Sequence, residues 1–299
     1  MSPSLKGNFM LMATALIWGM SFVAQRVGAQ VVGAFAFNGI RFALGGLSLI
    51  PLVLYLQRKV PRDEMIRAFK SAAPGGILMG SVLFVAAALQ QIGMSYTTAG
   101  NAAFITGLYI ILVPFLSLFL KKRVEGQTWV AGIIAVIGLY LMTVQKGLST
   151  NVGDLYELVG SIFWASHILL VDHFVKKHDA LHLSIIQFFS CSILSGAAAL
   201  IFEQNTGQMV LDAWLPIFYG GFMSVGIAYT LQVMGQKYVK PSLAAIILSF
   251  EIVFAALSAA WLLSETFSAR GYFGAGLIFS GIILSQTKWP KRGAAKSSS

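Results

Sequence analysis

The chain has 299 residues, of which 57% are hydrophobic and only 11% charged, and its mean hydropathy is +0.77. This composition excludes an ordinary water-soluble domain. The net charge of +10 does not indicate a nucleic-acid partner, because the basic residues lie mainly in short connections between apolar stretches.

Ten apolar stretches are long enough to cross a lipid bilayer. They cover residues 9–25, 33–56, 72–93, 99–120, 127–145, 155–175, 181–202, 213–236, 241–263 and 270–287. The remaining connections leave no room for a soluble catalytic domain, and the sequence contains no GxxxxGK[ST] phosphate loop. We therefore predict an all-α integral membrane protein with ten transmembrane helices that is not an enzyme and holds no cofactor or metal.

The basic residues alternate in number from one connection to the next. Of the 21 Lys and Arg residues, 17 lie in one set of alternate connections and termini, and 3 lie in the opposite set. Because cytoplasmic loops retain Lys and Arg, this asymmetry predicts that both termini are cytoplasmic and that the number of spans is even. We expect a multi-pass protein of the inner (plasma) membrane, embedded in the lipid bilayer as a monomer or weak dimer. Binding of anionic lipid head groups is an alternative use of these charges.

The sequence repeats itself about halfway along. Residues 89–110 align with residues 231–252 at an offset of 142, with eight identities in 22 positions, and Trp18 and Phe42 align with Trp164 and Phe188 at an offset of 146. A five-span unit is therefore used twice, in residues 1–148 and 149–299. Because five is odd, the second copy enters the membrane from the opposite side, which predicts two inverted repeats and suits alternating access. A rigid scaffold of two similar halves is the alternative.

The first and sixth stretches carry polar or aromatic side chains along one helical face. In the first stretch these are Thr14, Trp18, Ser21 and Gln25, and in the sixth they include Trp164 and His167. Such a face is costly in lipid, so we expect both to line an interior cavity. His167 could bind a proton there or form a hydrogen bond between helices.

Two charged residues lie well inside predicted spans. Arg41, in the second stretch, could attract a substrate carboxylate, or it could snorkel or cap a neighbouring helix. Glu251 lies about ten residues from each end of the ninth stretch, near the midplane where transporters built from inverted repeats bind substrate. We expect Glu251 to bind a cationic group or a proton. The alternative is a structural hydrogen bond or an ion pair with Arg41.

Other polar side chains on the third, fourth and eighth stretches complete the predicted lining. They are Gln90, Asn101, Thr106, Tyr109, Tyr229 and Gln232. A lining of aromatic, amide and hydroxyl groups fits a small amphipathic solute. Gln91 and Gln236 are expected mainly to hold helices together. Asp172, His173, His178 and His182 are close in sequence, but they show no tight metal-ligand spacing.

In their order along a duplicated five-span unit, several motifs resemble the drug/metabolite transporter superfamily, in its ten-helix EamA type. They are ALIWGMSFVAQR in the first span, NGIRFALGG in the second, Pro114 in the fourth, LKKRVEG after it, and LSFEIVFAALSAAWLLSE, with Glu251 and Glu265. In this family a proline commonly follows the ninth-span glutamate, whereas Ile252 follows Glu251 here, which removes the usual reason for a kink.

The resemblance implies a secondary transporter with a central cavity between its halves, often an exporter of amino acids or other small metabolites. We therefore expect alternating-access transport of an amino acid-like or other amphipathic solute, with proton coupling left open against facilitated diffusion. A lipid-handling or channel-like membrane protein is the main alternative, and a membrane-embedded transferase is the third.

Overall fold

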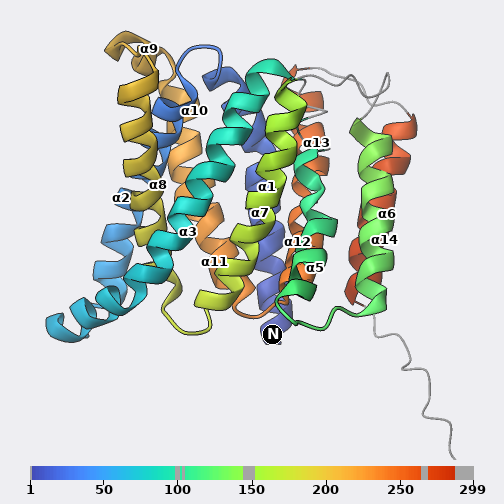
Figure 1. Ribbon diagram of the computed structural model, residues 1–299, viewed down its shortest axis with the longest axis horizontal. Helices are drawn as coiled ribbons and strands as arrows, with labels where there is room; N and C mark the ends of the chain where they lie inside the picture. The colour runs from blue at the N-terminus through green and yellow to red at the C-terminus, as the bar shows by residue number, and fades with distance from the viewer. Residues whose placement is uncertain (1, 98–101, 103–104, 144–151, 264–268, 287–299) are drawn as a thin grey trace, which may run out of the picture.

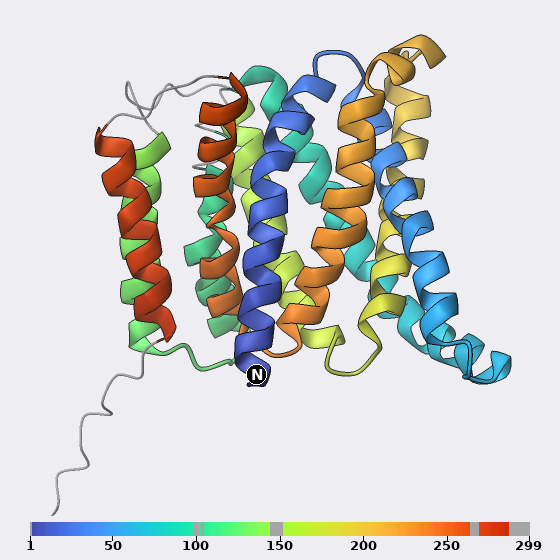
Figure 2. The ribbon, with the colours of Figure 1, turned by 180° about the vertical axis from the view of Figure 1, so that it is seen from behind.

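The computed structural model describes residues 2–97, 102, 105–143, 152–263 and 269–286. Within these ranges the chain forms α-helices and one π-helix, with no strand. The helices stand side by side in a bundle, and α6 and α14 form a pair at one edge of it (Figures 1 and 2).

The helices follow one another with short connections. The first part of the chain forms α1 (Pro3–Gly28), α2 (Ala34–Leu56), α3 (Arg62–Tyr96), α5 (Tyr109–Phe119) and α6 (Gly126–Thr143). The second part forms α7 (Val152–Phe174), α8 (Ala180–Phe202), α9 (Gly207–Asp212), α10 (Trp214–Phe218), the π-helix η1 (Tyr219–Tyr229), α11 (Thr230–Gln236), α12 (Pro241–Leu248), α13 (Glu251–Leu263) and α14 (Ala269–Gln286).

Seven helical segments are long and apolar enough to cross a membrane. They are Pro3–Gly28, Ala34–Leu56, Arg62–Tyr96, Val152–Phe174, Ala180–Phe202, Trp214–Gln236 and Pro241–Ser258. Three more apolar helices, Ile105–Phe119, Gly126–Leu141 and Ala269–Ser285, have between 10 and 17 residues in the described part of the chain. They are shorter than the roughly 20 residues of a typical span. The prediction of ten crossings therefore stays a prediction.

Local chemistry explains several helix ends. The Ser2 hydroxyl accepts a hydrogen bond from the Leu5 amide at the start of α1, and the Asp179 carboxylate accepts two from the first turn of α8. Both satisfy amides that a helix leaves unpaired. α3 begins at Arg62, well before the apolar stretch predicted from residue 72, because Asp63 and Glu64 suit the positive end of a helix.

The helix containing Glu251 is broken although no proline follows that residue. α12 ends at Leu248 and α13 begins at Glu251, and the Phe250 amide donates to the Ile247 carbonyl, three residues back. The fourth stretch has the same feature: α5 begins at Tyr109, and the Leu108 amide donates to the Ile105 carbonyl. Leu108 and Phe250 are equivalent at the offset of 142, so both copies of the repeat change their hydrogen bonding at the same place.

The packing of helices follows the same correspondence. In the repeat, α3 is equivalent to η1 and α11, and α7 is equivalent to α1. α3 contacts α7, and the equivalent elements η1 and α11 contact α1. α3 also contacts α8, and the equivalent pair, η1 and α2, is in contact as well. α2 and α8 are equivalent to each other, as are α6 and α14, and each of these two pairs is in contact.

Candidate functional site

A hydrogen bond between two repeat-equivalent residues lies at the centre of the bundle. The Tyr109 hydroxyl donates to Glu251 Oε1 over 3.0 Å, and both side chains are buried. Each residue begins a helix directly after the change in hydrogen bonding, since Tyr109 starts α5 and Glu251 starts α13. The two broken spans, which lie far apart in sequence, therefore meet at their breaks.

Three aromatic rings form a wall beside this pair. The Tyr229 ring lies between the two repeat-equivalent tryptophans, with its centroid 4.5 Å from the Trp18 ring in an edge-on contact and 6.3 Å from the Trp164 ring in a stacked one. Trp18 Nε1 donates to the Ser224 carbonyl over 3.2 Å. That carbonyl belongs to the π-helix η1, a form of helix that occurs often at functional sites.

Arg41 also faces this region and is buried, with 2% of its surface exposed. Its Nε donates to Asn38 Oδ1 over 2.9 Å, and its guanidinium carbon lies 5.4 Å and 5.0 Å from the ring centroids of Phe37 and Phe42. The ion pair with Glu251 that the sequence allowed is not formed, because Glu251 is bonded to Tyr109 instead. The Arg41 and Glu251 side chains therefore border the cavity without pairing with each other.

The tyrosines, the tryptophans, Arg41 and Glu251 border a central cavity. Its lining consists of Trp18, Phe22, Gln25, Arg41, Gln90, Thr106, Tyr109, Trp164, Ile168, Ser224, Tyr229, Gln232, Leu248 and Glu251. Ten of the residues that the sequence placed in the lining are among them: Trp18, Gln25, Arg41, Gln90, Thr106, Tyr109, Trp164, Tyr229, Gln232 and Glu251.

Three other residues that the sequence placed in the lining, Thr14, Ser21 and His167, do not border this cavity. Ser21 is buried and accepts a hydrogen bond from Gln25, which stands between it and the opening. His167 is buried against α8, with Nε2 2.8 Å from Gln187 Oε1. This contact is the hydrogen bond between helices that the sequence analysis gave as the alternative to proton binding by His167 in the cavity. Asn101 lies outside the described residues, as does Glu265.

A buried carboxyl group lies directly behind the lining. The Thr106 hydroxyl, which borders the cavity, donates to Glu157 Oε2 over 2.8 Å. Glu157 is on α7 and is 1% exposed. Its position gave no sequence signal, because the predicted span begins at residue 155 and a glutamate there looks like a boundary residue. α7 begins at Val152, which carries Glu157 further into the bundle.

Comparison with known proteins gives a consistent assignment. The model of the EamA-like transporter family matches twice, over residues 5–144 and 151–287. An uncharacterized transporter of Archaeoglobus fulgidus is 32% identical over 279 residues, which cover 92% of this chain and 83% of the relative. The chain belongs to the EamA-like transporter family. It is therefore a multi-pass membrane protein of a transporter family.

More distant relatives and a solved structure agree with this membership. The Bacillus subtilis uncharacterized transporter YoaV is 24% identical, covering 94% of this chain and 97% of its own. The Escherichia coli K12 uncharacterized inner membrane transporter YedA is 23% identical, covering 92% and 88%. A crystal structure superposes with a TM-score of 0.80 at 17% identity, covering 94% of this chain and 96% of the other, which establishes likeness of fold alone.

Some lining residues of this EamA-like transporter had weak sequence signals and others had none. Phe22 lies four residues after Trp18, so the helical period of α1 already placed it on the same face. Ser224 takes part through its backbone carbonyl, which no side-chain pattern reveals. Gln91 and Gln236 each donate to a backbone carbonyl of a neighbouring helix, at Gln25 and Ile168.

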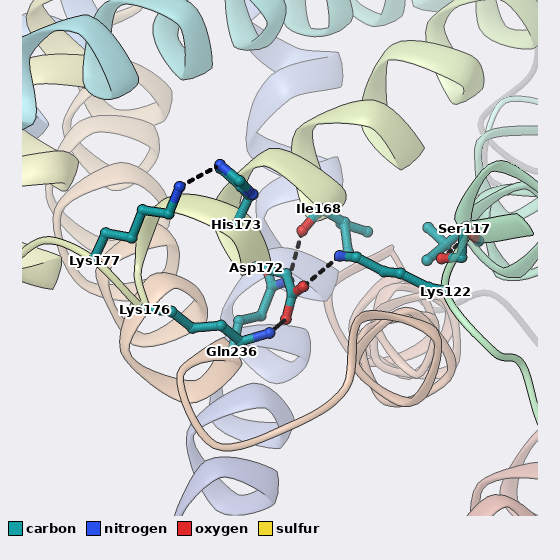
Figure 3. A network of polar contacts seen from close by, with 9 residues as sticks. Ser117, Lys122, Ile168, Asp172, His173, Lys176, Lys177 and Gln236 are labelled. Carbon is teal, nitrogen blue, oxygen red and sulfur yellow. Dashed lines mark hydrogen bonds and ion pairs between the residues drawn. The ribbon is translucent and has the colours of Figure 1, made fainter. Parts of the chain in front are cut away.

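A polar network connects the helices at the end of the bundle where the N-terminus lies (Figures 1 and 3). The Asp172 carboxylate is buried on α7 and pairs with Lys122, which follows α5, at 2.7 Å and with Lys176 at 2.6 Å. His182 instead bonds Gln57, and His173 lies 3.0 Å from Lys177. No group of three His, Cys, Asp or Glu side chains in the described ranges is arranged to hold a metal.

Proposed function

We propose that this EamA-like transporter is a secondary-active carrier that moves a small amphipathic solute, such as an amino acid, by alternating access. The observation that carries the proposal is the hydrogen bond from Tyr109 to Glu251. It joins the two halves at equivalent residues, beside breaks in both helices. Transporters built from inverted repeats bind their solutes at such broken helices near the midplane.

The carrier has ten spans, arranged as two inverted repeats in residues 1–148 and 149–299. The two family matches, the paired helix breaks and the exchangeable helix contacts support this arrangement. The excess of basic residues in alternate connections supports cytoplasmic termini. Reporter fusions at the two ends test this point, since reporters on opposite sides would contradict an even number of spans.

The charges of the cavity favour a solute with two opposite charges. Arg41 and Glu251 both line it without pairing with each other, and the rings of Trp18, Trp164 and Tyr229 line the same cavity. In a state with a wider cavity, a carboxylate would bind beside the guanidinium and an ammonium group beside Glu251, while an apolar side chain would pack on Trp18 and Trp164. Export is the direction of flux that the family resemblance implies.

The solute is tested by binding and then by transport. Purified protein is screened by thermal shift against amino acids, nucleobases, sugars and organic cations, since a ligand of the folded form raises apparent stability. We expect amino acids or similar zwitterions to raise the melting temperature, and the best of them to show saturable counterflow in proteoliposomes. Movement of lipid between leaflets without counterflow would instead indicate a lipid-handling protein.

Glu251→Gln is the informative variant. It keeps an oxygen that can accept the Tyr109 hydrogen bond but removes the charge, so we expect a folded protein with at least about tenfold weaker binding of the best zwitterion. Glu64→Gln supplies a control that makes the same change of charge on an exposed residue at the start of α3, outside the lining. Normal transport by Glu251→Gln with unchanged pH dependence would contradict both solute binding and proton coupling at this position.

A further inference from the structure

Glu157 is a buried carboxyl group that the proposed solute site does not use. It is 1% exposed, and Thr106 provides a hydrogen bond to Oε2. Its other oxygen, Oε1, is also buried and has no hydrogen-bond partner among the described residues. Burying an ionised carboxylate oxygen without a hydrogen-bond partner is strongly unfavourable, whereas a bound proton removes the charge.

Among the described residues, the elements around Glu157 present no compensating positive charge. On α7 the nearest charged group is Asp154, one turn earlier, which carries the same sign and accepts a hydrogen bond from Thr97. From α3, Gly93 lies against Glu157 and has no side chain to offer; a Cβ added to it would lie 2.8 Å from Glu157 Oε1. The segment before α5 presents Thr106. The ion pairs of the described residues join other groups.

Thr106 connects this carboxyl group to the cavity. Its side chain lines the cavity and donates its single hydroxyl hydrogen to Glu157. An ionised carboxylate is only an acceptor, so it holds that hydrogen. A protonated carboxyl group can donate to the hydroxyl oxygen instead, which leaves the hydroxyl hydrogen free for an acceptor on a solute. The protonation of Glu157 and the occupancy of the cavity are therefore linked through one hydroxyl group.

We propose that Glu157 is a proton-binding site, separate from Glu251, that senses the central cavity through the Thr106 hydroxyl. A proton from water binds at Oε1 and returns to water when the carboxyl group ionises, so no other reactant is required. The link to solute occupancy rests on the proposed carrier function, whereas proton binding at Glu157 does not.

Infrared difference spectroscopy of the purified full-length protein tests the site without any solute. The probe is the C=O stretching band of a protonated carboxyl group, recorded as the pH is raised and with hydrogen exchanged for deuterium. We expect wild type to show a band that disappears at high pH. Glu157→Gln should lose one component of it, and Glu251→Gln should retain that component.

Thr106→Val is the second variant. Removal of the hydroxyl hydrogen bond should shift the frequency of the Glu157 component and its titration, and leave the remaining carboxyl band in place. Identical spectra for wild type and Glu157→Gln, a Glu157 component that never titrates, or a component that Thr106→Val does not move would overturn the proposal. Because no transport is measured, failure of the carrier proposal would leave these results unchanged.

Discussion

At the scale of single residues, the two halves use equivalent tryptophans differently. Trp18 Nε1 donates to the Ser224 carbonyl, whereas Trp164 Nε1 is buried without a hydrogen-bond partner among the described residues. Both rings line the cavity. An unpaired donor beside a cavity is available to a solute, while a paired donor stabilises the fold.

Replacing each tryptophan by phenylalanine separates these two uses. Trp18→Phe should lower the free energy of unfolding by about 1 kcal/mol, because the Ser224 carbonyl loses its donor. Trp164→Phe should change it by less than about 0.5 kcal/mol and weaken binding of the best solute by roughly 2- to 10-fold. Thermal unfolding and ligand-induced shifts of the two proteins measure both quantities. Equal effects on stability would contradict the assignment.

The sequence predicted the location of these residues better than their bonding. Helical spacing placed Trp18 on an interior face, and the repeat placed Trp164 on another, because both depend on periodicity alone. Pairing depends on neighbours from other helices. His167 could be identified as buried, but its bond to Gln187 on α8 required the helix packing to be known.

At the scale of helices, the sequence predicted apolar stretches but not their interruptions. Residues 241–263 form one apolar stretch in the sequence, without glycine and without an internal proline, yet α12 and α13 are separate. A proline inside a helix favours a bend, and Pro114 lies in the fourth span, whereas the change in hydrogen bonding is at Leu108. Such breaks depend on contacts between the two halves, as does the π-helix η1, and local propensity does not encode them.

Close helix contacts are testable at glycines. A Cβ at Gly80 on α3 would lie 2.6 Å from the Gln187 carbonyl oxygen of α8, a backbone atom that cannot rotate away, whereas a Cβ at Gly276 on α14 meets nothing within 4 Å. Gly80→Ala should destabilise the protein by about 1–3 kcal/mol through overpacking. Gly276→Ala should match or slightly exceed wild type, since alanine favours helices. A melting temperature equal to wild type for Gly80→Ala would show that α3 and α8 are further apart.

At the scale of the whole molecule, alternating access requires contacts that hold one end closed and that break when this end opens. The repeat predicted an organisation into two halves, but it does not predict which groups join them. Asp172 and Lys122 do so at the end where the N-terminus lies, in the network of Figure 3. Because Asp172 is buried and the pair links α7 to the segment after α5, we expect it to stabilise the state closed at that end.

On the proposed alternating-access function, Asp172→Asn should therefore favour the state open at that end. A single reporter cysteine, Gln90→Cys in a Cys191→Ala background, places a thiol in the cavity lining, since Cys191 is the only native cysteine. We expect a membrane-impermeant thiol reagent applied from the N-terminal side to react roughly 5- to 10-fold faster after Asp172→Asn, a moderate factor because the lysines are partly exposed. Glu125→Gln breaks the exposed pair with Lys240 at the same end and should leave the rate unchanged. Equal rates in all three proteins would mean that the buried pair only stabilises the fold and does not hold that end closed.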